Sequence, residues 1–234
     1  MRRAGTLLIA VAAVAIVTAA MAPEAAAKRL SDQFIRIEVN DTDGDAGIHL
    51  FLDGEGWDTM QLRDPEGNVL FSILGEGSVG FQGITETFFE SAEPSFDEQT
   101  LDELLELFPE GIYTYKGTTT EGKKLRGRAR LTHRIPDAPV QVSPLEGDEV
   151  DPEDAVFTWE PVADPPGSSI VAYEIVVECE EPTVRKILAQ VDGSVTSYTA
   201  APEFFENADE CKWEVLSIEE SGNQTISEVE FDLE

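Results

Sequence analysis

Phe157-Thr-Trp159-Glu-Pro161 begins the stretch that decides the fold. After a turn cluster at 164–167, the stretch resumes as Ile170-Val-Ala-Tyr173-Glu-Ile175-Val-Val177-Glu-Cys179. Apolar residues at every second position from Tyr173 to Cys179 place these side chains on one face of a strand. A later run, Cys211-Lys-Trp213-Glu-Val215-Leu-Ser217, repeats the alternation and is followed by a turn at Gly222. These runs predict a mostly β structure.

The order and spacing of the runs resemble strands B, C and F of a fibronectin type III module. Trp159 stands at the strand-B tryptophan, Ile170-x-x-Tyr173 at the start of strand C, and Gly222 at the turn that closes strand F. The resemblance covers roughly residues 137 to 234. It implies an immunoglobulin-like β-sandwich over residues 140–234, and modules of this kind generally bind or space other molecules.

The same resemblance implies a disulfide bond between Cys179 and Cys211. Cys211 stands where strand F usually carries the tyrosine of a tyrosine corner. Strands C and F are antiparallel neighbours in this fold, and both cysteines have the parity that faces the core. The alternative is two buried free thiols. Metal binding is disfavoured, because two cysteines without a nearby histidine do not complete a zinc site.

The first 27 residues have the pattern of an export signal. Arg2 and Arg3 precede an apolar run from Leu7 to Val17, and Ala25-Ala-Ala27 is a small-residue cleavage site. The apolar run is short for a bilayer span, although an uncleaved anchor helix remains an alternative. No later segment is apolar enough to cross a membrane. We therefore expect a protein that is secreted into the periplasm or the extracellular space.

The chain is strongly acidic, with 47 acidic and 16 basic residues and a formal net charge of −31. A surface of this sign repels phosphate, so nucleic acid is not expected as a partner. The acidic residues are concentrated in the second half, where residues 137–234 hold 25 acidic and 3 basic side chains. This composition suits a solvated surface in a saline exterior.

Residues 28–135 predict a first, β-sandwich-like domain with one short helix. Strands are expected at 34–39, 48–52, 59–63, 69–74 and 124–134, with one more near 84–88 in a long loop at 75–95. Asp64-Pro-Glu-Gly67 predicts a type I turn and therefore a hairpin. The sequence from Phe108 to Tyr115 loosely resembles the start of the last hairpin in secreted immunoglobulin-like domains. Residues 136–139 are expected to form a short, stiff linker.

The helix is expected at about residues 96–107. Ser95-x-x-Glu98 has the pattern of a capping box, in which the two side chains satisfy backbone N–H groups at a helix start. An apolar stripe at helical spacing follows, formed by Leu101, Leu104, Leu105 and Phe108. The stripe has the width of a core contact, so we expect the helix to pack on the sheet.

Asp41, Asp43 and Asp45 form the first candidate site. Alternating carboxylates with backbone carbonyls approach the six to eight oxygen ligands that calcium takes. The pattern is incomplete, because Gly44 interrupts it and Leu52 stands where a calcium loop carries its last acidic ligand. A polar hairpin turn is the alternative. The sequence indicates no cofactor other than this possible calcium ion.

Arg126, Arg128, Arg130 and Arg134 form the second candidate site. Period-two spacing places them on one face of the strand expected at 124–134. This basic stripe could bind an anionic polysaccharide or dock against the acidic second domain. Cross-strand pairing with acidic neighbours is the alternative, and it contributes little for each exposed pair.

An enzyme is not expected. His49 and His133 are the only histidines, and neither has a spaced partner that suggests metal or nucleophile chemistry. We expect a non-catalytic binding, adhesion or structural module whose partner is a protein or an extracellular glycan. A calcium-dependent carbohydrate-binding accessory of an extracellular enzyme system is the alternative. An extracellular hydrolase is a third reading, but a carboxylate pair carries no information among 47 acids.

Overall fold

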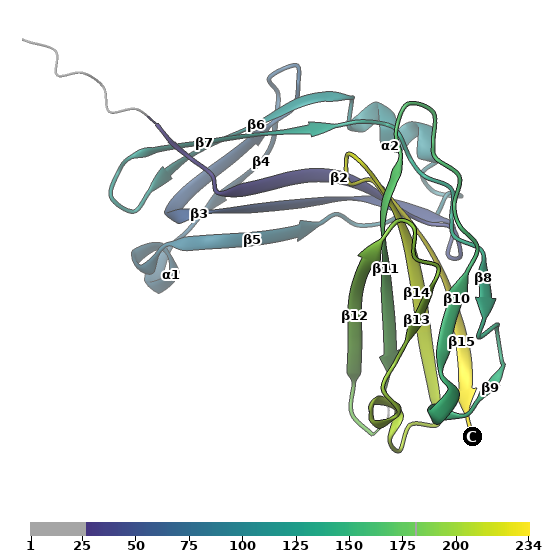
Figure 1. Cartoon of the computed structure of the whole chain (residues 1–234). Coiled ribbons are helices and arrows are strands. Elements are labelled where there is room, and N and C mark those ends of the chain that lie inside the picture. Colours follow the sequence, from purple (N-terminus) through teal and green to yellow (C-terminus); the bar gives the residue numbers. More distant parts are fainter. Residues whose placement is uncertain (1–26, 181) are drawn as a thin grey trace, which may run out of the picture.

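The computed structural model describes residues 27–180 and 182–234 (Figure 1). The expected export signal lies outside them, except for Ala27. The strands of the N-terminal unit are β1 (Lys28–Arg29), β2 (Asp32–Asn40), β3 (Asp45–Arg63), β4 (Val69–Leu74), β5 (Ile84–Glu90), β6 (Gly111–Thr119) and β7 (Lys124–Leu131). Its helices are α1 (Gly77–Gln82) and α2 (Leu101–Leu107). None of the helices in the described ranges is long and apolar enough to cross a membrane.

The C-terminal unit consists of strands and two short 3-10 helices, η1 (Pro152–Asp154) and η2 (Pro202–Phe205). Its strands are β8 (Gln141–Ser143), β9 (Glu149–Val150), β10 (Val156–Trp159), β11 (Ile170–Cys179), β12 (Arg185–Asp192), β13 (Ser197–Thr199), β14 (Glu210–Glu219) and β15 (Gln224–Leu233). The prediction of a mostly β chain is confirmed.

The C-terminal unit is a sandwich of two sheets. β8, β10 and β13 form one antiparallel sheet, and β12, β11, β14 and β15 form the other layer. Alternating residues from both layers meet in one buried cluster that includes Phe157, Trp159, Tyr173 and Trp213. The rings of Trp159 and Tyr173 pack edge to face with centroids 5.4 Å apart. This unit therefore has the immunoglobulin-like β fold that the resemblance implied.

Cys179 and Cys211 form the predicted disulfide bond. The two residues lie directly opposite each other on β11 and β14, and their Cα atoms are 4.3 Å apart. Both side chains are buried among the apolar residues of the sandwich. The bond therefore joins the two central strands of one layer.

Strand β3 organises the N-terminal unit. Its first half pairs with β2 and β5, and its second half pairs with β4 and β6. β7 continues the sheet beyond β6, and β1 pairs with β7. The two halves of this bent sheet enclose a core that includes Ile37, Leu50, Trp57 and Tyr115. The two layers of this unit thus share one strand.

β3 is one strand, so the prediction of separate strands at 48–52 and 59–63 was wrong. Gly54 and Gly56 lie where the pairing with β5 shifts, between Asp53 and Trp57. A Cβ atom at Gly54 would come within 2.9 Å of the end of the Leu30 side chain, which would have to shift. The glycines bend the strand and do not end it.

Helix α2 begins later than predicted. Thr100 caps it: the Glu103 N–H donates to the Thr100 hydroxyl at 3.3 Å, and the Thr100 N–H donates to the Glu103 carboxylate at 2.9 Å. Ser95 and Glu98 instead close a turn, in which the Glu98 N–H donates to the Ser95 carbonyl at 2.8 Å. Ser95-x-x-Glu98 and Thr100-x-x-Glu103 both have the capping-box pattern, and only the second begins the helix. Helix α1 was not predicted.

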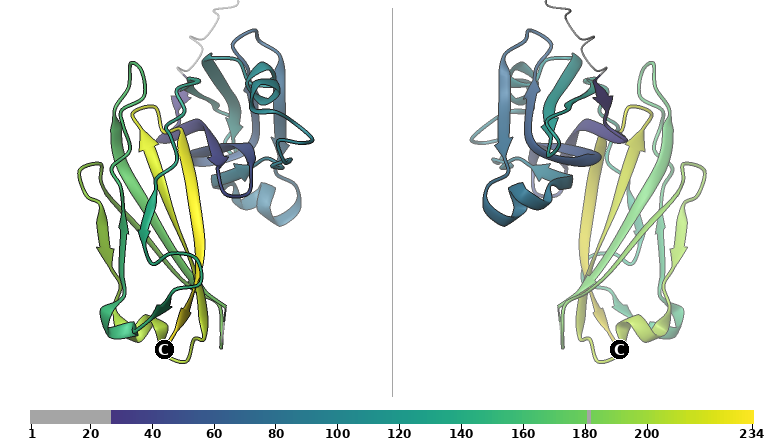
Figure 2. Two further views of the ribbon diagram at one scale, coloured as in Figure 1. Left: turned by 90° about the vertical axis from the view of Figure 1, so that its right-hand side faces the viewer. Right: turned by 90° about the vertical axis from the view of Figure 1, so that its left-hand side faces the viewer.

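One sheet runs through both units. β2 and β15 pair in parallel, with 38–40 beside 224–226, and they join all the other N-terminal strands to β14, β11 and β12. The strands of the two units run in clearly different directions (Figure 1), and the side views show β15 against the N-terminal unit (Figure 2). The units therefore meet through backbone pairing as well as through the linker.

Hydroxyl groups hold the linker against the C-terminal unit. Ser217 donates to the Asp137 carbonyl at 2.8 Å, and Thr225 donates to the Pro136 carbonyl at 2.7 Å. Ser227 donates to a third linker carbonyl, that of residue 139, at 2.6 Å. The linker is therefore hydrogen-bonded to the C-terminal unit at residues 136, 137 and 139.

Asn223 connects the two units at their junction. Its side chain is fully buried. The side-chain oxygen accepts from the Ile37 N–H at 2.9 Å, and the amide nitrogen donates to the carbonyls of Thr132 and Arg134 at 2.9 and 3.0 Å. One amide thereby satisfies backbone groups of β2 and of the chain that leaves β7.

Candidate functional site

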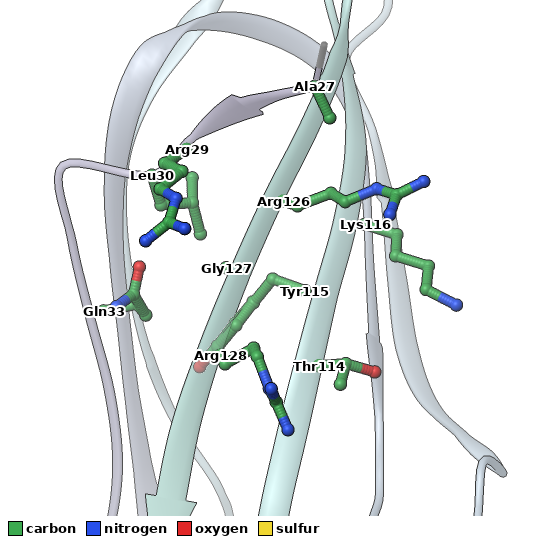
Figure 3. A pocket seen from close by; sticks show the side chains of 10 residues that line it. All are labelled: Ala27, Arg29, Leu30, Gln33, Thr114, Tyr115, Lys116, Arg126, Gly127 and Arg128. Carbon is green, nitrogen blue, oxygen red and sulfur yellow. The ribbon is translucent and has the colours of Figure 1, made fainter.

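A basic groove with a volume of about 640 Å³ lies beside β1, β7 and β6 (Figure 3). Its cationic residues are Arg29, Lys116, Arg126 and Arg128. In Figure 3, Lys116 and Arg126 project together on one side of β7, and Arg29 lies on its other side. The groove therefore gathers four cations in a chain that is otherwise strongly acidic.

Strand register explains why these cations are neighbours. Arg126 lies opposite Lys116 in the antiparallel β6–β7 pair, and Arg29 is its partner in the parallel β1–β7 pair. Arg128 follows two residues later on the same face of β7, opposite Thr114. Like charges that lie directly opposite each other repel and are destabilising. A bound anion would relieve this repulsion.

Within the described parts of the chain, none of these four cations forms an ion pair within 4.0 Å. Cross-strand pairing with acidic neighbours therefore does not account for the stripe. Of the predicted stripe, Arg134 lies against the C-terminal unit, where its guanidinium is beside Gly167. The two units also join through β2, β15 and Asn223.

The structure places the other two predicted arginines outside the groove. Arg130 is exposed further along β7, opposite Ile112. Arg134 lies beyond the end of the strand at Leu131, and its carbonyl accepts from Asn223. The expected strand at 124–134 was therefore too long, and the four arginines do not share one strand face.

The turn that contains Asp41, Asp43 and Asp45 is held by its own hydrogen bonds. The Asn40 amide oxygen accepts from the backbone N–H groups of Thr42 and Asp43, and its nitrogen donates to the Asp43 carboxylate at 3.1 Å. The pKa of Asp45 is raised by burial and by the charge of Asp43. In the part of the chain that is described, no choice of one oxygen from each of these three carboxylates brings all three within 4.8 Å of one another. Calcium at this turn stays a prediction.

Glu38, His49 and Glu93 form a second cluster, next to the junction of the units. One ligand atom from each lies within 4.8 Å of the others. His49 Nε2 is 3.5 Å from Glu38 and 3.9 Å from Glu93, and Glu90 lies 4.0 Å away on the more exposed side. The Phe88 ring packs edge to face against the imidazole, with centroids 5.2 Å apart.

Burial controls the protonation of this cluster. It raises the pKa of Glu38 to about 8 against the opposing charge of Arg36, and Glu93, Glu90 and Glu214 raise it further. It raises the pKa of Glu93 to about 7, with Glu90 and Asp45 adding to the effect. Burial, and then the charge of Arg36, lowers the pKa of His49 to about 4. His49 is therefore a neutral imidazole at pH 7.

No protein-family model matches the sequence, and no curated protein matches it. Solved structures with some similarity include a tetra-tandem repeat in the extending region of a large adhesion protein, at a TM-score of 0.28 and 12% identity. The match covers 87% of this chain and 50% of that chain, so this protein spans half the length of the repeat structure.

Two further matches are of the same kind. The FN1–FN3 domains of chicken CNTN1 match at a TM-score of 0.35 and 10% identity, over 88% of this chain and 68% of that one. A 1.5-MDa bacterial ice-binding adhesin matches at a TM-score of 0.26 and 14% identity, over 89% and 66%. These scores are too low to support an argument about function.

Glu38→Gln is expected to raise the free energy of unfolding at pH 8.5 by about 2 kcal/mol, and by much less at pH 5.5. The folded-state pKa of Glu38, about 8, lies above the ordinary value of 4.5, so the folded protein holds a proton that the unfolded chain has lost. The stabilisation from this proton is lost as pH rises from 4.5 through 8. Each pKa unit corresponds to about 1.4 kcal/mol, and relaxation of the site reduces the sum.

Urea unfolding at the two pH values, in the presence of a chelator, measures this effect. Arg36, Glu90, Glu93 and Glu214 also face the carboxyl group and remain in the variant. Glu86→Gln, an exposed change on neighbouring β5, is the matched control and should alter stability little at either pH. Equal effects of Glu38→Gln at both pH values would contradict the prediction.

Sequence reasoning found part of the groove and missed the cluster. Arg126 and Arg128 were predicted from their alternation, but Arg29 and Lys116 join them only through strand pairing. His49 was judged to lack partners, since Glu93 is distant in sequence. The β2–β3 hairpin could have indicated that Glu38 and His49 are neighbours, because its register places Glu38 opposite Gly47, two residues before His49.

Proposed function

We propose that this chain is a non-catalytic extracellular binding module whose basic groove holds an acidic polysaccharide. The observation that carries the proposal is the set of four cations, Arg29, Lys116, Arg126 and Arg128, around one groove and without an acidic partner in the described residues. Carboxylate and sulfate groups on a glycan are the ligands that guanidinium groups bind in pairs of parallel hydrogen bonds.

The groove follows β7 from Arg126 to Arg128 and is bordered by β1 and β6. Neighbouring Gln33 and Thr114 add polar side chains that can bind hydroxyl groups of a sugar. The acidic remainder of the surface is screened beyond about 8 Å at physiological salt, so the local cations decide the interaction.

Two further features support an extracellular role. The disulfide between Cys179 and Cys211 suits an oxidising compartment. The hydrogen bonds between the linker and the C-terminal unit, together with the β2–β15 pairing, hold the two units in a fixed orientation. A spacing or adhesion module requires such a fixed orientation. Both features agree with the export signal expected at residues 1–27.

The double substitution Arg126→Gln/Arg128→Gln is expected to weaken binding of an acidic polysaccharide about tenfold. Two charge-assisted contacts of about 0.7 kcal/mol each account for this factor. Isothermal titration calorimetry with heparin and with polygalacturonate measures it, and uncharged dextran is the ligand control. Binding of the unsubstituted protein should also weaken as salt is raised.

Arg130→Gln/Lys186→Gln removes the same charge from positions outside the groove and is the matched control. It should change the affinity less than twofold. The groove could instead bind the acidic half of a second copy of the chain. Size-exclusion chromatography with light scattering at low salt detects such self-association. If the unsubstituted protein binds neither polysaccharide and instead self-associates through its acidic half, the proposal is wrong.

A further inference from the structure

We propose that Glu38, His49 and Glu93 form a metal site that binds one zinc ion per chain. The site is separate from the basic groove and does not depend on the function proposed for it. Two carboxylate oxygens and one imidazole nitrogen converge there from β2, from β3 and from the chain that follows β5.

An unpartnered nitrogen points into the cluster. His49 is 5% exposed, and its Nε2 atom is buried without a hydrogen-bond partner. Its distances of 3.5, 3.9 and 4.0 Å to the carboxylates of Glu38, Glu93 and Glu90 are too long for good hydrogen bonds. A buried polar atom in this position is costly unless something else occupies the space between the four groups.

The spacing suits a metal ion. Zinc in tetrahedral geometry has bonds of about 2.0–2.1 Å, which hold its ligand atoms about 3.3 Å apart. The distances from His49 Nε2 to Glu38 and Glu93 are 3.5 and 3.9 Å, so a small inward movement of flexible side chains completes the geometry. Glu90 or water can take the fourth position.

The backbone makes room for Glu93. A Cβ atom at Gly47 would lie 2.7 Å from both the Cγ and an oxygen of Glu93, so only glycine leaves this carboxylate its place. The Ser91 hydroxyl accepts from the Ile48 N–H at 2.9 Å, and the Ser91 N–H donates to the Ile48 carbonyl at 3.0 Å. These bonds fasten the segment that carries Glu93 to β3.

Outer contacts orient the other two ligands. The Gln224 amide nitrogen donates to one oxygen of Glu38, which leaves the other oxygen facing His49. The Phe88 ring packs against the imidazole edge to face. Partners of this kind orient the ligands of metal sites. Because Gln224 belongs to β15, the site is also linked to the junction of the two units.

The donor set favours zinc over calcium. Calcium takes six to eight oxygen ligands, whereas imidazole nitrogen together with carboxylate oxygen suits zinc. Binding requires the proton of His49 to lie on Nδ1, where the Arg36 guanidinium now approaches at 3.4 Å. This contact is long, so the imidazole can change tautomer if the guanidinium withdraws slightly. In the structure, Arg36 also lies over the Phe34 ring, 4.9 Å from the centroid.

Titration of the full chain, stripped with a chelator, with zinc chloride tests the proposal. Calorimetry is expected to show one zinc per chain, and zinc should raise the melting temperature because it binds the folded state. His49→Gln and Glu93→Gln should each weaken binding at least tenfold. Millimolar calcium should not compete. Cobalt(II) should give visible absorption in the unsubstituted chain that both variants lose.

Two controls keep the result decisive. His133→Gln removes the other histidine and should leave zinc binding unchanged. Glu93 lies on a partly exposed segment, so Glu93→Gln is expected to fold, and circular dichroism verifies this for both variants. Zinc binding that survives in the folded Glu93→Gln variant, or an unsubstituted chain that shows no zinc heat and no thermal shift, would overturn the proposal.

Discussion

Removing the disulfide bond with Cys179→Ala/Cys211→Ala is expected to lower the free energy of unfolding by about 4 kcal/mol. The two cysteines are 32 residues apart, and closing a loop of this length restricts the unfolded chain by roughly 3 to 4 kcal/mol in the chain-entropy estimate. Both side chains are buried in the sandwich, so the lost sulfur contacts add to the effect. This is the largest effect that we expect from any change that leaves the backbone intact.

Urea unfolding followed by tryptophan fluorescence measures the loss, since Trp213 lies in the same core as the disulfide. The slope of the unfolding free energy with urea should increase, because the unfolded chain without the bond exposes more surface. Unsubstituted protein with its disulfide reduced is the control that separates loop closure from packing, as it keeps both sulfur atoms. A loss below about 1 kcal/mol would show that the bond contributes little to the folded state.

Local sequence patterns predicted the central strands of the C-terminal unit. Alternation from Tyr173 to Cys179 and from Cys211 to Ser217 defined β11 and β14, and the resemblance supplied their pairing. The N-terminal unit was harder to predict because its strands depend on tertiary contacts. Gly54 has the pattern of a strand end, yet β3 continues through it, and only the register of its pairing with β5 shifts between Asp53 and Trp57.

The candidate sites show the same limit. A period-two pattern within β7 indicated Arg126 and Arg128, but no pattern connects them with Arg29 or Lys116 before the strands are paired. The zinc cluster depends on the register of the β2–β3 hairpin and on a glycine that admits Glu93. Long-range pairing decides such sites, and a single sequence carries little information about it.

Asn223→Ala is expected to lower the free energy of unfolding by about 3 kcal/mol and to weaken the junction between the units. The substitution leaves the Ile37 N–H and the carbonyls of Thr132 and Arg134 without their partner. Each buried polar group that loses its hydrogen bond costs about 1 to 3 kcal/mol, and partial access of water to the carbonyls reduces the sum.

Urea unfolding and limited proteolysis at residues 132–139 measure the two effects together. Asn68→Ala is the matched control, since Asn68 is an exposed turn residue whose side chain donates to Asp64, and it should cost less than about 1 kcal/mol. Asn223→Asp keeps the acceptor for Ile37 but turns a charge toward two carbonyls, so its loss should exceed that of alanine and should diminish as the carboxyl group is protonated at low pH. If Asn223→Ala unfolds like the control and its linker stays resistant to protease, the other contacts at the junction, the β2–β15 pairing among them, hold the units together without Asn223.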